Sequence, residues 1–156
     1  MIRVLGIALI TLLVDQISKT YVVQYLNLKE KLSIDVINPF LNFRMAWNKG
    51  INFGLFSSGG PASRIILVTL SICICAGLLW WVRNSKDLVQ RFFVALIIGG
   101  ALGNALDRVI FGAVVDFLNM SCCGLRNPFS FNVADIAIFV GAFALLFYTN
   151  NDNEIN

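Results

Sequence analysis

Four stretches of the chain are apolar over enough residues to form membrane-spanning helices. They cover about residues 5–26, 65–82, 92–111 and 133–148. The second is the cleanest, because it holds no charged residue over about 18 positions, close to the minimum that crosses the hydrocarbon of a bilayer. Polar residues interrupt the first and gather in the last third of the third, and the fourth is short. The pattern predicts four spans, with both chain ends on one side of the membrane.

The segment 27–63 is too polar and too rich in turn residues to be a further span. Turns are predicted at Asn38-Pro39, Asn48-Lys49-Gly50 and Gly59-Gly60-Pro61. The aromatic run Phe40–Trp47 between them favours a β-strand. A small sheet lying on the membrane surface would follow, and the alternative is a plain connector. The aromatic side chains available at the interface would be Phe40, Phe43, Trp47, Phe53 and Phe56.

The composition is typical of a membrane protein and excludes several kinds of catalytic site. The chain of 156 residues is predicted to be one domain, residues 1–156, and 58% of it is hydrophobic and only 13% charged. Soluble domains are nearer half apolar. The net charge of +3 without a run of Lys or Arg argues against nucleic-acid binding. The absence of His excludes Ser-His and Cys-His nucleophiles and most metal sites, so we expect neither a metal nor a cofactor.

The four cysteines do not change that expectation. Cys73 and Cys75 lie in an apolar span, and we interpret them as packing residues. Cys122 and Cys123 are adjacent in a loop, where they either oxidise or stay reduced. Neither pair has Cys-x-x-Cys spacing, which argues against a zinc site.

Charge patterning alone leaves the orientation open. Residues Met1 to Val14 look like a secretory signal, but no small-x-small cleavage site follows, so we expect a retained first helix. The short loop 83–91 holds three basic residues, which favours the cytoplasm for this loop and for both termini. The longer loop 27–63 holds four, which argues for the opposite orientation.

Charged and amide side chains inside the predicted spans need partners. Asp15 and Lys19 stand four positions apart, so they share a helix face and can neutralise each other, either as a structural pair or in support of a reaction site. Asn104, Asp107 and Arg108 also share a face, after a glycine-rich run that allows close helix approach. Neighbours on a helix point about 100° apart, so Asp107 and Arg108 are each expected to find another partner. These polar residues either form a cluster that only holds the helices together, or Arg108 contacts the substrate or a lipid headgroup.

Two aspartates, Asp116 and Asp135, lie at the edges of the third and fourth apolar stretches. The end of one helix and the start of the next share a membrane face, so the two carboxylates can converge. Acids in or beside hydrocarbon are functional candidates, and two nearby carboxylates share one proton. The ionised acid would take a proton from water as the water attacks a peptide carbonyl, while the protonated acid donates to the carbonyl oxygen. The pattern predicts an intramembrane aspartyl protease, without assigning the two roles. The alternative is two unrelated interfacial acids.

Five blocks of the sequence, in order, resemble the motifs of the lipoprotein signal peptidases (signal peptidase II), over nearly the whole chain. The blocks are Asp15–Lys19, Asn48–Phe53, Gly99–Arg108, Val115–Phe117 and Phe131–Asp135. One block alone would be weak, but five with these spacings are highly specific. Asn52 departs from the family, which usually has a small Ala there, and this puts the fine shape of the loop in doubt. Cys122 and Cys123 match no motif of the family.

The resemblance implies an all-α membrane protein of four transmembrane helices with cytoplasmic termini, a small extracytoplasmic β-sheet cradle and a short extracytoplasmic helix. It implies that Asp116 and Asp135 are catalytic and remove the signal peptide of a prolipoprotein immediately before its diacylglyceryl-modified cysteine. The enzyme would be a monomer among the lipids of the bacterial cytoplasmic (inner) membrane, with its site at the outer-leaflet face, and globomycin and myxovirescin would inhibit it. The implied substrate-binding or supporting positions are Asn48, Gly50, Asn104, Asp107, Arg108, Asn132, Asp15 and Lys19.

Two other functions compete with the peptidase. A small proton-coupled transporter would also place Asp, Lys and Arg within the membrane. Against it, the second and fourth spans lack a polar stripe, and there is no internal repeat of the kind many transporters show. A non-catalytic membrane scaffold would use the polar residues only to fasten helices together, and Asn at position 116 or 135 would then abolish no reaction.

Overall fold

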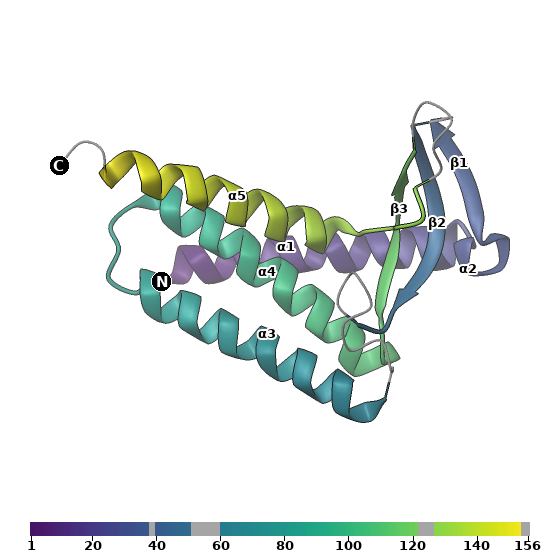
Figure 1. Ribbon diagram of the computed structural model, residues 1–156, viewed down its shortest axis with the longest axis horizontal. Helices are drawn as coiled ribbons and strands as arrows, with labels where there is room; N and C mark the ends of the chain where they lie inside the picture. The colour runs from purple at the N-terminus through teal and green to yellow at the C-terminus, as the bar shows by residue number, and fades with distance from the viewer. Residues whose placement is uncertain (38–39, 51–59, 122–126, 154–156) are drawn as a thin grey trace.

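The computed structural model describes residues 1–37, 40–50, 60–121 and 127–153. Its long helices are α1 (Ile2–Thr20), α3 (Pro61–Val82), α4 (Leu88–Phe111) and α5 (Val133–Asn153). Its strands β1 (Ser33–Ile37), β2 (Leu41–Asn48) and β3 (Val114–Met120) form an antiparallel sheet in the order β1-β2-β3. Figure 1 shows the sheet at one end of the helix bundle, with the N-terminus and the last turn of α5 at the other end.

Helix α4 is the centre of the bundle, because it packs against α1, α3 and α5. The main core lies between these helices towards the chain ends and consists of small and branched apolar side chains. Its buried members are Val4, Ala8, Cys75, Val82, Val94, Ala95, Ile98 and Leu145. Cys75 is one of them, which agrees with its interpretation as a packing residue, whereas Cys73 is exposed.

Glycines on α4 bring its neighbours close, as the sequence predicts. A Cβ atom at Gly100 would lie 2.5 Å from the carbonyl oxygen of Ala134 on α5. A Cβ atom at Gly103 would lie 2.8 Å from the Oδ2 atom of Asp15 on α1. The lack of a side chain at these two positions therefore allows α1 and α5 to reach the same short stretch of α4.

The outward faces of the helices are apolar. In α3, Ile65 is 62% exposed, and in α5 Leu146 is 67% exposed, whereas soluble proteins rarely leave such residues in contiguous patches. Helices α3 and α4 have the length and hydropathy of membrane spans, and the apolar part of α5, Val133–Tyr148, is shorter. The described chain thus has the outer surface of a membrane protein.

The small sheet that the sequence predicts is present and has three strands. The strand expected at Phe40–Trp47 is β2, whereas the sequence pattern did not locate β1 and β3, and the chain is mostly helical with this sheet added. Gly112 ends α4 in the left-handed region, with a φ of 78°, and β3 begins two residues later at Val114. The run Val114–Met120 is rich in β-forming residues, and its pairing with β2 makes it a strand.

The first helix also differs from the prediction at its end. The expected span reached residue 26, but α1 ends at Thr20 and continues as a π-helical segment, η1 (Tyr21–Tyr25), closed by the bond from the Leu26 amide to the Tyr21 carbonyl. A four-residue helix, α2 (Leu28–Lys31), then leads into β1. Val22, Leu28 and Phe117 form a second apolar cluster, which attaches the sheet to the end of the bundle.

Candidate active site

Asp116 lies on β3, paired with Ala46 of β2, and its side chain points into the protein, where only 2% of the residue is exposed. Its two oxygens accept hydrogen bonds from two amides. The Nδ2 atom of Asn132 donates to Oδ1 at 2.7 Å, and the Nδ2 atom of Asn48 donates to Oδ2 at 3.2 Å. Both amides come from positions that the sequence predicts as supporting residues.

Asp135 lies in the first turn of α5 and forms a reciprocal cap with Asn132, the residue before that helix. The Asp135 amide donates to Oδ1 of Asn132 at 2.9 Å, and the Asn132 amide donates to Oδ2 of Asp135 at 3.2 Å, as in a capping box. The Nδ2 atom of Asn104 donates to the other oxygen of Asp135 at 2.8 Å. Asn132 therefore touches both aspartates, and the structure brings the two predicted acids to one place.

Burial and, to a smaller extent, the nearby charge of Asp135 raise the pKa of Asp116 to about 7, although the hydrogen bonds from Asn48 and Asn132 act in the opposite direction. A carboxyl group with this pKa keeps its proton much more readily than an exposed one. The pair can therefore hold one proton near neutral pH, which is the arrangement that general acid–base chemistry needs.

A buried ion cluster lies next to the two acids, on α1 and α4. The Nζ atom of Lys19 is 2.7 Å from Oδ2 of Asp15 and 2.8 Å from Oδ2 of Asp107, and all three side chains are almost fully buried. The predicted pair of Asp15 and Lys19 is therefore present and is extended by a second acid. Lys19 also donates to Oδ1 of Asn104 at 3.3 Å, which joins the ion cluster to the amide that holds Asp135.

Both acids of the ion cluster also accept backbone hydrogen bonds from β3 and α5, the elements that carry the dyad of Asp116 and Asp135. The Ala134 amide, at the start of α5, donates to Asp15 at 2.9 Å. The Val115 amide, one residue before Asp116, donates to Asp107 at 3.1 Å. The cluster thereby fixes the backbone on both sides of the site.

Arg108 and Asp107 have separate partners, as the helix geometry predicts. The Nη2 atom of Arg108 donates to the Gly50 carbonyl at 3.1 Å, and Nη1 donates to the Asn104 carbonyl at 3.3 Å. The Gly50 amide in turn donates to Oδ1 of Asn48 at 3.2 Å. Arg108 thus holds the turn after β2 beside the dyad, and every predicted site residue belongs to one connected network.

Gln16 belongs to this network, although the sequence did not single it out. Its Nε2 atom lies within hydrogen-bond distance of Oδ2 of Asp15 at 3.1 Å and of Oδ1 of Asp107 at 2.9 Å. It follows Asp15 directly and stands in the first of the five blocks, which is the signal that could have found it.

Several sequence predictions fall on residues that the structure does not describe. These are the interfacial roles of Phe53 and Phe56, the departure at Asn52 and the redox state of Cys122 and Cys123. Within the described ranges, no three His, Cys, Asp or Glu side chains are grouped so that they could hold a metal ion.

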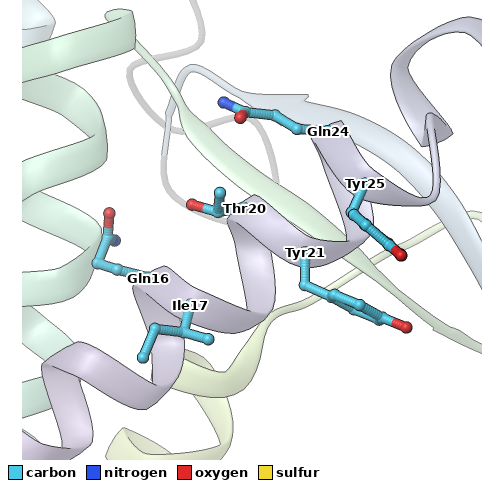
Figure 2. Close-up of a pocket in the computed structure, with 6 residues that line it drawn as sticks. All are labelled: Gln16, Ile17, Thr20, Tyr21, Gln24 and Tyr25. Carbon is cyan, nitrogen blue, oxygen red and sulfur yellow. The ribbon is translucent and has the colours of Figure 1, made fainter.

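Two cavities lined by described residues lie along α1 and η1. The first, of about 630 Å³, runs past Tyr21 and Tyr25 and is drawn in Figure 2. The second, of about 320 Å³, reaches Lys19 and Asp107 and is also lined by Trp47 of β2. Neither is lined by Asp116 or Asp135, so both lie on the ion-cluster side of the site.

Comparisons with known proteins agree on one family. A family model described as "Signal peptidase (SPase) II" matches residues 7–150. A lipoprotein signal peptidase of Pelagibacter ubique is 40% identical over 97% of this chain and 93% of its own length. One of Rhodopseudomonas palustris is 38% identical over 89% of this chain and 86% of its own length.

The fold is similar to that of solved structures. A bacterial membrane enzyme determined by the in meso method superposes with a TM-score of 0.82 at 27% identity, over 97% of this chain and 89% of that chain. A second structure with the same description gives a TM-score of 0.79 at 26% identity, over 94% of this chain and 92% of that chain.

Proposed function

This chain belongs to the signal peptidase II family, and from that premise we propose that it is an aspartyl endopeptidase of the membrane. It removes the signal peptide of a prolipoprotein immediately before the diacylglyceryl-modified cysteine. Asp116 and Asp135 are its catalytic residues. The observation that carries this proposal is that Asn132 donates to both carboxyl groups, with its side-chain amide to Asp116 and with its backbone amide to Asp135. The two acids thereby belong to one hydrogen-bonded unit.

In the proposed reaction, the ionised member of the pair removes a proton from a water molecule as the water oxygen attacks the scissile carbonyl carbon. The protonated member donates its proton to the carbonyl oxygen, which gives a tetrahedral gem-diol. The two acids then exchange roles. The acid that took the proton from water donates it to the leaving nitrogen as the C–N bond breaks, and the other acid takes a proton from a hydroxyl of the gem-diol, which leaves a carboxylic acid and an amine with one proton again on the pair. The raised pKa of Asp116 supports this mechanism, because one acid must be protonated while the other is ionised.

Arg108 and Asn48 position the substrate in this proposal. The Nε atom of Arg108 is buried and has no hydrogen-bond partner in the described part of the chain. Buried donors of this kind are rare, and an incoming peptide carbonyl would satisfy it. Asn48 and Gly50 lie at the end of β2, where an extended substrate segment can approach the dyad.

The apolar outer surface supports a place in the membrane, and the proposed orientation is the one that the resemblance to the family implies. Helices α1, α3, α4 and α5 span the bacterial inner membrane, with the termini in the cytoplasm and with the sheet and α2 on the extracytoplasmic side. The whole chain, 1–156, acts as one monomeric domain without a cofactor. Globomycin and myxovirescin are expected to inhibit it.

The distribution of polar groups favours a peptidase over a transporter. The ion cluster and both aspartates lie at the sheet end of the bundle, while the core between the helices towards the termini is apolar. Among the described residues, this arrangement offers no polar path from one end of the bundle to the other. A scaffold would need the polar network but not an acid with a pKa near 7.

A cleavage assay tests the proposal. Purified protein is incubated with a prolipoprotein that carries the diacylglyceryl-modified cysteine, and a matched substrate with Ser in place of that cysteine serves as control. We expect a shortened product only from the lipid-modified substrate, and no product when globomycin is present. Absence of cleavage, or equal cleavage of both substrates, contradicts the proposed function.

A further inference from the structure

Gln16 lies where the two acids of the ion cluster meet. Its Nε2 atom is 3.1 Å from Oδ2 of Asp15 and 2.9 Å from Oδ1 of Asp107, and it also lies 3.4 Å from the Gly103 carbonyl. Lys19 contacts the same two acids. The cluster therefore holds two carboxylates and one cation, and the amide of Gln16 supplies the neutral donors that the second carboxylate needs when it is buried.

The hydrogen bonds of Asp107 lead from Gln16 to the dyad. Asp107 accepts from Gln16 at Oδ1 and from the backbone amide of Val115 at Oδ2. The Val115 carbonyl accepts from the side chain of Asn132, at 3.2 Å, and the same side chain holds Asp116. A rotation of Asp107 would therefore move the backbone at Val115 and, with it, the carboxyl group of Asp116.

Gln16 is also the side chain that connects the ion cluster to the larger cavity along α1, because that cavity is lined by Gln16 but by no member of the cluster, whereas the smaller cavity reaches Lys19 and Asp107 directly. Asp15 and Asp107 are 0% exposed, while Gln16 is partly exposed and lines both cavities. Figure 2 shows Gln16, Thr20 and Gln24 on one side of the helix and Ile17, Tyr21 and Tyr25 on the other. Gln24 lines the same two cavities but makes no hydrogen bond to the cluster among the described residues, so it is a matched control.

We propose that Gln16 is a positioning residue of the hydrolytic reaction, which acts on Asp116 by fixing the carboxylate of Asp107. This inference rests on the proposed function, because the reaction is the one that Asp116 and Asp135 catalyse. Gln16 does not touch the substrate. Its loss should therefore lower kcat and leave KM unchanged.

The first test compares Gln16→Leu with Gln24→Leu in detergent, with the lipid-modified prolipoprotein as substrate. Leu keeps most of the volume of Gln16 but removes its donors. We expect kcat of Gln16→Leu to fall about tenfold, within the ~100-fold that a 1 Å displacement of a reacting group can cost, with an unchanged KM. Gln24→Leu should keep the wild-type kcat. A kcat of Gln16→Leu within about twofold of the wild type, or an equal loss in Gln24→Leu, overturns the inference.

The second test uses Gln16→Glu, whose protonated form keeps one donor while its ionised form adds a third carboxylate beside Asp15 and Asp107. Lys19 is the cation that faces this group, and Lys29 and Glu30 of α2 face it across the smaller cavity. The ratio of kcat of Gln16→Glu to that of the wild type should rise as the pH falls, because protonation of the new Glu restores a hydrogen bond. A purely structural role would lower the melting temperature and leave this ratio independent of pH, which would overturn the inference.

Wild-type and Asp116→Asn proteins in the same assay separate this inference from the proposed function. Cleavage by the wild type and none by Asp116→Asn leave the proposed function standing, whatever Gln16→Leu does. Absence of cleavage by the wild type overturns both proposals. Should Gln16→Leu not accumulate in the membrane, the pH dependence of Gln16→Glu decides the inference alone.

Discussion

Asn132 is the residue on which the proposed site depends most. At the scale of single residues, the sequence already indicated which side chains belong to the candidate site, because burying a polar or charged group in or beside a membrane span costs free energy and such groups are therefore functional candidates. It could not indicate the bonds between them. The capping box of Asn132 and Asp135 is local and was readable from their spacing, but the bond from Asn132 to Asp116 depends on how β3 packs against α5.

The sequence analysis did not identify Gln16 as a site residue, for a related reason. A glutamine at the edge of a span can point to lipid, to solvent or to the core, and only the packing of α1 against α4 directs it to Asp107. The pair of Asp15 and Lys19 was predictable, because its geometry lies within one helix.

The pKa of Asp116 predicts a pH dependence. Activity needs one proton on the dyad, so kcat should fall about tenfold per unit as the pH rises above about 7. The same proton stabilises the fold, because the pKa in the folded state lies above its ordinary value of 3.8. That contribution is complete below about 3.8 and is lost as the pH rises through about 7. A profile of kcat between pH 5 and 9 that stays flat on the alkaline side contradicts this account.

The contacts of Arg108 lead to a second prediction, which concerns kcat/KM and the pH profile of Arg108 variants. Arg108→Ala removes the bond to the Gly50 carbonyl and a positive charge near Asp116 and Asp135. Charge-assisted bonds contribute about 1.5–3 kcal/mol, so kcat/KM should fall by roughly 10–100-fold. Loss of the charge should also move the alkaline limb of the pH profile to higher pH, because a cation favours the ionised carboxylate.

Arg108→Lys is the matched control, since it keeps the charge and loses the forked geometry. Its pH profile should have the wild-type alkaline limb. A shift of the limb in Arg108→Lys equal to that in Arg108→Ala would show that the charge is not the cause. Melting temperatures of both variants separate lost binding from lost folding.

At the scale of elements, long apolar stretches were predictable and short strands were not. Helix α4 ends at Phe111, where the sequence places the end of the third span, because its apolar run and the following Gly112 are local signals. Strands β1 and β3 depend on pairing with β2 across the sheet, which no local pattern reveals. The π-helical end of α1 likewise has no signal in the residues Tyr21–Tyr25 themselves.

The close approach of α1 and α4 at Gly103 predicts a specific sensitivity. Gly103→Ala would place a Cβ atom 2.8 Å from Asp15, so the ion cluster must shift. We expect a loss of about 1–3 kcal/mol in the free energy of unfolding, together with reduced activity. Gly77→Ala on α3 is the control, because nothing lies within 4 Å of its added methyl group.

For Gly77→Ala, the melting temperature in detergent should stay the same or rise slightly, since Ala is the better helix former by about 1 kcal/mol. Equal melting temperatures for the wild type, Gly103→Ala and Gly77→Ala would show that α1 and α4 do not pack as closely as described.

At the scale of the whole molecule, the sheet lies at one end of the bundle, and the N-terminus and the last turn of α5 lie at the other end (Figure 1). The apolar pattern predicted helices, and the fold gathers their polar residues next to the sheet. Charge counting in the loops had left the orientation open, because loop 27–63 carries more basic residues than the short loop 83–91. The proposed orientation places the sheet, and so the site, at the extracytoplasmic surface.

Reporter fusions test that orientation. A reporter that is active only in the cytoplasm should be active at both the N-terminus and the C-terminus, and a reporter that needs export should be inactive at both. The physical reason is that an even number of spans returns the chain to its starting side. Activity of the exported reporter at either end excludes four spans with cytoplasmic termini.

The central claim is that Asp116 and Asp135 together catalyse the hydrolysis, and the most direct measurement is the cleavage rate of two nearly isosteric variants. Asp116→Asn and Asp135→Asn should each lower kcat by at least about a thousandfold while the protein accumulates in the membrane with its normal melting behaviour. Asp35→Asn on the exposed face of β1 should keep the wild-type rate. Cleavage at near wild-type rates by either dyad variant would contradict the account.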